Sequence, residues 1–146
     1  MAAPPYALDT NILVHGVRRS PLWGRVQARY RLLVAEPTPL VSVVSVGELR
    51  AVAPLREWGP ARVDQMEFIL SCFTAVPVGG VDLVGTYARF AAAAVRDGHA
   101  IGQNDLWIAA TAAAAGATLL TTDRDFDWLP PDRLTVRWID PADPAP

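Results

Sequence analysis

Four acidic residues, each beside an apolar segment, could together hold a metal ion. Asp9 and Asp123 directly follow short apolar runs, whereas Glu48 and Asp105 lie in the first turns of two expected helices. Two carboxylates about 4 Å apart repel each other by about 4 kcal/mol at an effective dielectric constant of ~20. If the fold brings these four side chains together, the cluster must therefore take up protons or a cation.

The residue types favour a hard dication at such a cluster. The only histidines, His15 and His99, stand far apart in the sequence, and Cys72 is the single cysteine. Carboxylate oxygens without histidine or cysteine select Mg²⁺ or Mn²⁺ over zinc. A dication held in this way keeps several water molecules, lowers their pKa and stabilises charge on a phosphate. The reaction class that fits is hydrolysis of a phosphodiester.

Each acid also has a purely structural interpretation, which stays open at this point. Asp9 and Asp105 could cap or stabilise the N-termini of helices. Glu48 stands three residues after Ser45, the spacing of a capping box, and Asp123 could stabilise a turn. Capping can equally use serine, threonine or asparagine, so four acids at one edge of a sheet are less well explained by capping.

Several other chemistries are excluded by composition. The chain has no lysine, so all 13 of its lysine or arginine residues are arginine. Without lysine there is neither a P-loop nor a Schiff base. A G-x-S-x-G motif is absent, so serine hydrolysis has no support. A single cysteine allows no internal disulfide and no cysteine zinc cluster.

Charge is segregated along the chain although the net charge is only −2. The segment between Thr10 and Ala35 contains no acid, and the C-terminal third is rich in acids. A basic element beside an acidic one suits a polyanion held near a metal, although a solvated helix face explains the basic segment as well. The arginines of this basic segment are Arg18, Arg19, Arg25, Arg29 and Arg31.

The elements that must position the acids alternate between strand and helix. The 146 residues fit one domain, which we expect to span 1–140, with a disordered tail at 141–146. Alternating elements predict a parallel sheet with helices on both faces, and sites in such folds form at the carboxyl ends of the strands. We expect strands at 6–9, 37–45, 73–78, 117–122 and 134–139, and helices at 22–34, 45–55, 66–73, 81–96 and 104–115.

The sequence predicts neither a membrane-spanning helix nor a secretion signal. The apolar run from Leu106 to Leu120 would span roughly 22 Å as a helix, less than a bilayer core of ~30 Å. The first ten residues have neither a basic nor an apolar segment of a secretion signal. We therefore expect a cytoplasmic protein without a membrane segment.

Four segments, in this order, resemble the PIN-domain nucleases: LDTNIL, VSVVSVGEL, NDLWIAATA and LLTTDRDF. Within that family the chain is most similar to the VapC-type toxins of toxin–antitoxin pairs, over residues 6–139. The resemblance implies a three-layer α/β/α sandwich with a mainly parallel sheet. It also implies a Mg²⁺-dependent ribonuclease acting on single-stranded RNA, a homodimer and a small antitoxin that blocks the site.

The resemblance also implies roles for residues of this sequence. By position, Asp9, Glu48, Asp105 and Asp123 match the acidic quartet of the family, with Asp125 as an alternative fourth acid. Thr10 and Asn11 match the polar residues that support the geometry of the site.

Our hypothesis from these residues assigns a role to each acid. Asp9 and Asp105 ligate the metal, Asp123 ligates it or holds one of its waters, and Glu48 orients or deprotonates the attacking water. Three arginines of the basic segment contact RNA in this hypothesis: Arg18, Arg19 and Arg25.

Two alternatives remain at this point. A phosphatase with an aspartyl nucleophile usually needs a second aspartate where Asn11 stands, and also a lysine. A non-catalytic module that binds RNA or protein could retain the same fold. Val26, Tyr30 and Met66 could face a partner, although helical apolar stripes more often belong to the core.

Overall fold

The computed structural model describes residues 3–142 and contains a five-stranded sheet in the order β3-β2-β1-β4-β5. Each pair of neighbouring strands is parallel, which confirms the predicted α/β class. The strands are β1 (Tyr6–Leu8), β2 (Leu40–Ser42), β3 (Thr74–Val76), β4 (Thr118–Thr121) and β5 (Thr135–Trp138). The helices are α1 (Thr10–Arg18), α2 (Pro21–Tyr30), α3 (Val43–Leu55), α4 (Pro60–Ser71), α5 (Val81–Arg96) and α6 (Gln103–Ala114), with a 3₁₀ turn at Leu32–Val34.

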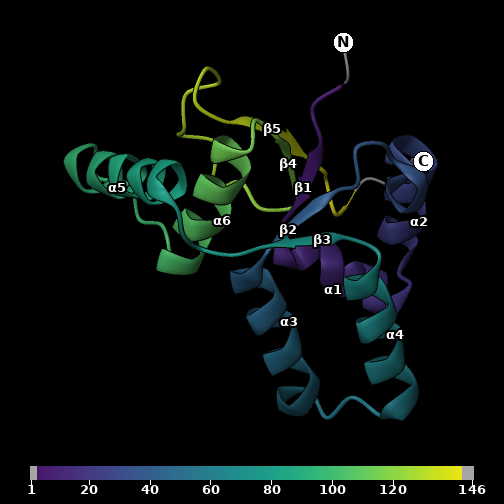
Figure 1. Ribbon diagram of the computed structural model, residues 1–146. Coiled ribbons are helices and arrows are strands. Elements are labelled where there is room, and N and C mark those ends of the chain that lie inside the picture. The colour runs from purple at the N-terminus through teal and green to yellow at the C-terminus, as the bar shows by residue number, and fades with distance from the viewer. Residues whose placement is uncertain (1–2, 143–146) are drawn as a thin grey trace.

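Helices cover both faces of the sheet, so the molecule has three layers (Figure 1). Successive residues of a strand point to opposite faces. Leu8 and Leu120 accordingly pack with α1 to α4, whereas Ala7 and Leu119 pack with α5 and α6. These two apolar clusters hold the central strands from both sides, and the expected three-layer sandwich is confirmed.

The register of β1 and β4 determines where the candidate site lies. Leu8 pairs with Leu120, and the backbone N–H of Asp9 donates to the carbonyl of Leu120 at 3.0 Å. Asp9 therefore lies beside Thr121, the last residue of β4. Because all strands are parallel, the loops that follow β1, β2 and β4 leave the sheet at the same edge.

The helix α3 begins earlier than its sequence pattern predicts. The strand expected at 37–45 is limited to Leu40–Ser42, and the Ser42 hydroxyl caps the helix by accepting from the N–H of Val44 at 3.1 Å. Ser45, expected to begin this helix, is instead fully buried inside its first turn. The capping-box interpretation of Ser45 and Glu48 is therefore wrong, because neither residue occupies a capping position.

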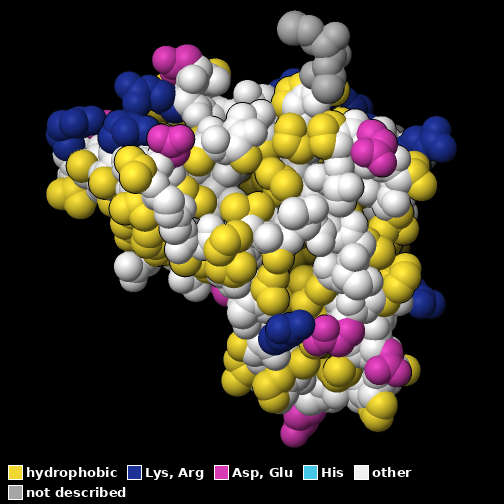
Figure 2. All heavy atoms as spheres, in the orientation of Figure 1, with side chains coloured by type: hydrophobic (Ala, Val, Ile, Leu, Met, Phe, Trp, Pro, Cys, Tyr) yellow, Lys and Arg dark blue, Asp and Glu magenta, His cyan; other side chains and the backbone are white. Residues whose placement is uncertain are grey.

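The bounds of α5 agree with the sequence prediction, and its buried face agrees in part. Helical spacing predicts one face made of Val84, Tyr87, Ala91, Ala94 and Val95. Ala94 is buried and Tyr87 and Ala91 pack against the core, whereas Val84 and Val95 are 47% and 85% exposed and Leu83 and Phe90 are buried instead. Alanine occupies so much of this helix that its apolar stripe cannot be located by counting. Apolar side chains consequently remain on the outer surface of α5, at the left in Figure 2.

Three residues considered as partner contacts belong to the core or its margin. Val26 and Met66 are buried with α1 and α3, and Tyr30 packs edge-on against Tyr6 with ring centroids 5.3 Å apart. In residues 3–142 no helix combines the length and the apolar character needed to cross a bilayer. Most of the tail expected to be disordered, residues 143–146, lies outside the described residues.

Candidate metal centre

Asp9 stands where β1 ends and α1 begins, and it is the most buried of the predicted acids at 4% exposure. Its Oδ1 accepts from the N–H of Thr10 at 2.7 Å, so it does cap α1, and its Oδ2 accepts from the Thr121 hydroxyl at 2.7 Å. Burial raises the pKa of Asp9 to about 6, despite these two hydrogen bonds, which lower it. The side chain is therefore fixed in place while its negative charge remains poorly solvated.

Glu48 lies on α3 and is tied to two other segments. Its Oε1 accepts from the hydroxyl of Thr10 at 2.7 Å, and its Oε2 accepts from the amide of Asn104 at 3.3 Å. The Thr10 hydroxyl is also hydrogen bonded to that of Ser45 at 2.9 Å. These contacts join the beginnings of α1, α3 and α6 around one carboxylate.

Asp105 lies in the first turn of α6, which begins at Gln103, one residue before the position expected. Its pKa is raised to about 7, with burial as the largest cause. The negative charges of four other acids contribute to the same rise: Asp9, Asp123, Glu48 and Asp125. All four predicted acids therefore lie close enough to act on one another, although they come from four separate segments.

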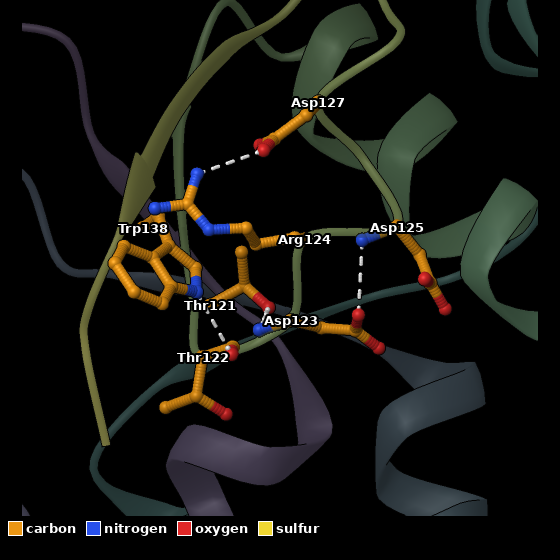
Figure 3. A network of polar contacts seen from close by, with 7 residues as sticks. All are labelled: Thr121, Thr122, Asp123, Arg124, Asp125, Asp127 and Trp138. Carbon is orange, nitrogen blue, oxygen red and sulfur yellow. Dashed lines mark hydrogen bonds and ion pairs between the residues drawn. The ribbon is translucent and has the colours of Figure 1, made fainter. Parts of the chain in front are cut away.

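Asp123 and Asp125 form a turn directly after β4 (Figure 3). The N–H of Asp123 donates to the Thr121 hydroxyl at 2.9 Å, and the N–H of Asp125 donates to Oδ1 of Asp123 at 2.9 Å. The negative charge of Asp123 raises the pKa of Asp125. Asp105, Asp123 and Asp125 each offer an oxygen within 4.8 Å of the other two, the one such group among residues 3–142.

For some acids the structural role and the proposed metal-binding role are therefore compatible. Asp9 caps a helix and Asp123 stabilises a turn, and both nevertheless lie in the acidic cluster. Asp105 and Asp123 meet as expected. Asp125, which the sequence left as an alternative to Asp123, lies beside both, whereas Asp9 is outside the group of three and adjoins it.

Two of the three predicted RNA-binding arginines lie at the far end of α1 from the acids. Arg18 and Arg19 stand at the end of α1, about 14 Å along the helix from Asp9, which precedes its first turn. The Arg19 guanidinium donates to Gln65 at 2.8 Å, and that of Arg25 donates to the carbonyl of Asp140 at 3.4 Å. Contact of these arginines with RNA stays a prediction.

Thr121 is a residue that the sequence analysis did not recognise as part of the site. It is fully buried, and its hydroxyl links Asp9 to the N–H of Asp123. Pairing β1 with β4 in the correct register would have identified it, because Thr121 follows the partner of Leu8. The two predicted supporting residues also bridge segments: Thr10 holds Glu48, and Asn11 Oδ1 accepts from the N–H of Thr122 at 3.3 Å.

The PIN-domain profile matches residues 6–130. The chain belongs to the PIN-domain family. Among curated proteins, none matches this PIN domain significantly in sequence.

Solved structures share the fold over almost the whole chain. VapBC2 from Rickettsia felis, solved bound to a DNA fragment from its promoter, is 24% identical with a TM-score of 0.77, covering 90% of this chain and 96% of that one. VapBC-5 from Mycobacterium tuberculosis, of the VapBC family of toxin–antitoxin systems, is 25% identical with a TM-score of 0.66, covering 94% and 98%. FitAcB from Neisseria gonorrhoeae is 23% identical with a TM-score of 0.70, covering 90% and 95%.

The side chains present fit a hard dication. The donors gathered at the sheet edge are carboxylate oxygens, and the pKa values of Asp9 and Asp105 are raised to about 6 and about 7, as expected where carboxylates lack a neutralising charge. Mg²⁺ and Mn²⁺ prefer such oxygens, and each carboxylate oxygen that accepts one hydrogen bond keeps a second lone pair for a ligand.

Proposed function

We propose that this PIN domain is a metal-dependent endoribonuclease that hydrolyses phosphodiester bonds of RNA, with Mg²⁺ as its ion and Mn²⁺ as a substitute. The observation that carries the proposal is that four acids distributed over 114 positions of the sequence lie together at the carboxyl edge of the sheet. They are Asp9, Glu48, Asp105 and Asp123. Membership of the PIN-domain family and the likeness to VapC-type folds support the same reading.

In this proposal Asp105 and Asp123 would hold the ion, with Asp9 and Asp125 as neighbouring carboxylates. When bound, the ion would neutralise charge on the scissile phosphate and lower the pKa of water. The N–H of Thr10 and the hydroxyl of Thr121 hold the Asp9 carboxylate in one orientation beside this group. Thr10 and Asn11 act by holding Glu48 and the segment after β4.

Glu48 orients the attacking water and accepts its proton. Its two oxygens are held by Thr10 and Asn104, so its carboxylate is aimed before substrate arrives. The water oxygen attacks phosphorus, the bond from phosphorus to the leaving sugar oxygen breaks, and that oxygen takes up a proton from solvent, while Glu48 later returns its proton to solvent. A positioned carboxylate in this role typically contributes 10²–10⁴-fold in rate.

We further propose that the protein is the toxin of a toxin–antitoxin pair and acts in the cytoplasm as a homodimer. A small antitoxin would block its activity by covering the acidic edge. The support is that several similar solved structures are of VapBC or FitAB, and that another is a toxin–antitoxin complex from Klebsiella pneumoniae. Arg18 and Arg19 at the end of α1 and Arg25 on α2 then bind RNA phosphates that extend beyond the acids.

A cleavage assay with a matched pair of variants tests the proposal. Random-sequence single-stranded RNA is incubated with the purified protein, with Mg²⁺ or with EDTA. Asp105→Asn removes an acid from the first turn of α6, and Asp82→Asn, the control, removes one from the first turn of α5. Cleavage should require Mg²⁺, persist in the control and be lost in Asp105→Asn.

Two results would contradict the proposal. A folded Asp105→Asn variant that cleaves at the wild-type rate would exclude the assigned role of Asp105. A wild-type protein that binds RNA without Mg²⁺-stimulated turnover would be a non-catalytic binding module.

A further inference from the structure

The turn after β4, which carries Asp123 and Asp125, is held from outside the acidic cluster by residues that the proposed reaction does not use (Figure 3). Two of them are Arg124, within the turn, and Trp138, the last residue of the edge strand β5. Trp138 pairs with Thr121 in the sheet, so it stands next to the point where the turn leaves β4.

Trp138 fixes the first residue of the turn through a hydrogen bond. Its indole N–H donates to the carbonyl of Thr122 at 3.0 Å. Thr122 is also held by α1, because its backbone N–H donates to Asn11 Oδ1 at 3.3 Å. Thr122 is thus held between β5 and α1, and the direction in which the chain enters Asp123 is set.

Arg124 fixes the middle of the turn by stacking on Trp138. Its guanidinium carbon lies 3.6 Å from the centroid of the Trp138 ring, a close cation–π contact. The guanidinium also pairs with Asp127 at 3.0 Å, which orients it over the ring. This ion pair is exposed, so by itself it stabilises little.

The side chain of Arg124 points away from the acids on either side of it. Figure 3 shows Arg124 directed toward Trp138 and Asp127, whereas the carboxylates of Asp123 and Asp125 lie on the other side of the turn. Anchoring the central residue to one side therefore directs its two neighbours to the side on which Asp105 lies.

We propose that Arg124 and Trp138 are positioning residues that hold Asp123 and Asp125 in the arrangement that binds the metal ion. The proposal rests on the function proposed above for the acidic cluster, and it concerns residues that touch neither ion nor RNA. Outer contacts that orient metal ligands typically change metal affinity by 10–100-fold when they are removed.

Electrostatics alone predicts the opposite sign for Arg124. Removing a cation beside several carboxylates makes the cluster more negative, which should tighten the binding of a dication. If Arg124 instead acts by holding the turn, its removal should weaken binding. The direction of the change therefore separates a positioning role from a bystander charge.

The experiment measures the Mg²⁺ dissociation constant of the full chain by calorimetry for Arg124→Gln and for a matched control, Arg137→Gln. Arg137 is exposed and is the neighbour of Trp138 on β5, so its variant removes the same charge from beside Trp138 without changing a residue of the turn. We expect Arg124→Gln to weaken Mg²⁺ binding roughly tenfold, and Arg137→Gln to leave it unchanged or slightly tighter.

A second pair of variants separates the two contacts of Trp138. Trp138→Phe keeps a ring face for Arg124 but loses the N–H donated to Thr122, and should weaken Mg²⁺ binding about threefold. Trp138→Leu loses both contacts and should weaken binding as much as Arg124→Gln. The double variant Arg124→Gln with Trp138→Leu should be little worse than either single variant, because both remove the same contact.

Amide hydrogen exchange of the metal-free protein gives a readout independent of metal and RNA. Exchange at residues 123–125 should be faster in Arg124→Gln than in Arg137→Gln, with α1 and α6 unchanged. Equal or tighter Mg²⁺ binding in Arg124→Gln, relative to its control, would overturn the proposal. If the wild type bound no Mg²⁺, the proposed function would fail. The exchange rates alone would then decide whether Arg124 and Trp138 hold the turn.

Discussion

The two sides of the acidic cluster are organised by different means. On the buried side, both oxygens of Asp9 accept hydrogen bonds, and Thr121 links this carboxylate to the turn after β4. On the exposed side, within residues 3–142, the Asp105 carboxylate accepts no hydrogen bond while negative charge surrounds it. One side is arranged by hydrogen bonds within the protein. On the other side, burial and repulsion between carboxylates raise the pKa of Asp105, and repulsion raises the pKa of Asp125.

This difference indicates what folding provides and what a cation must provide. Hydrogen bonds from donors fixed by the β1–β4 register orient Asp9 at no cost when substrate binds. The carboxylates of Asp105, Asp123 and Asp125 instead repel one another, which destabilises the folded protein until a positive charge arrives. Stability and activity should therefore respond in opposite directions to changes on the exposed side.

The largest expected effect is that of Asp105→Asn. Cleavage of RNA should fall by more than about a hundredfold, because an ion ligand is lost. The free energy of unfolding of the metal-free protein at pH 8 should rise by about 1 kcal/mol, a small value because water screens a half-exposed carboxylate. Chemical denaturation with and without EDTA measures this free energy. A variant that is both inactive and less stable would contradict the prediction that stability and activity change in opposite directions on the exposed side.

Glu48→Gln should have the next largest effect and should act on the rate alone. The amide side chain can keep the contact with Thr10 but cannot accept a proton, so we expect cleavage to fall by about a hundredfold. Mg²⁺ binding should stay close to that of the wild type. Glu67→Gln, which removes an exposed acid paired with Arg50 on the surface, is the matched control. A large loss of Mg²⁺ affinity in Glu48→Gln would instead make Glu48 a ligand.

Thr121→Val tests the buried side. The substitution leaves Asp9 Oδ2 without its donor and the N–H of Asp123 without its acceptor, so it should lower the free energy of unfolding by about 1–3 kcal/mol. Thr111→Val, which removes a buried hydroxyl bonded only to the carbonyl of Trp107, should cost less. Equal losses in the two variants, measured by urea denaturation, would show that Thr121 has no special part in arranging the acids.

The smallest expected effect is a dependence of stability on pH. The pKa values of Asp9 and Asp105 are raised by folding from 3.8 to about 6 and about 7, so the folded protein holds more protons than the unfolded chain between these limits. The contribution of these groups to stability therefore falls as pH rises from about 4 to about 7. Saturating Mg²⁺ should offset this loss, most clearly above pH 7. Thermal melting across this range in EDTA and in Mg²⁺ measures it, and identical curves in both would contradict the prediction.

Much of this arrangement followed from the sequence because its main elements are encoded locally. Alternating apolar strands and helices predicted a parallel sheet, and the positions of Asp9 and Asp123 after strands predicted a shared edge. The places of Glu48 and Asp105 in the first turns of expected helices predicted that they lie at the same edge, and the PIN-domain resemblance then matched all four acids to one quartet.

What the sequence did not predict depends on contacts between distant segments. The part played by Thr121 depends on the β1–β4 register, and that of Trp138 on the pairing of β5 with β4. The buried face of α5 was predicted only in part, because alanine is compatible with either face. Local spacing carries none of this information, because each contact joins segments that the folded sheet alone brings together.

The most direct test is a crystal of the wild-type protein soaked in Mn²⁺ at a concentration that supports cleavage, with anomalous scattering recorded from the metal. We expect a peak in contact with carboxylate oxygens of Asp105 and Asp123, adjoining Asp9. A soaked crystal with no peak at these carboxylates, under conditions in which the protein cleaves RNA, would contradict the assignment of these acids as metal ligands.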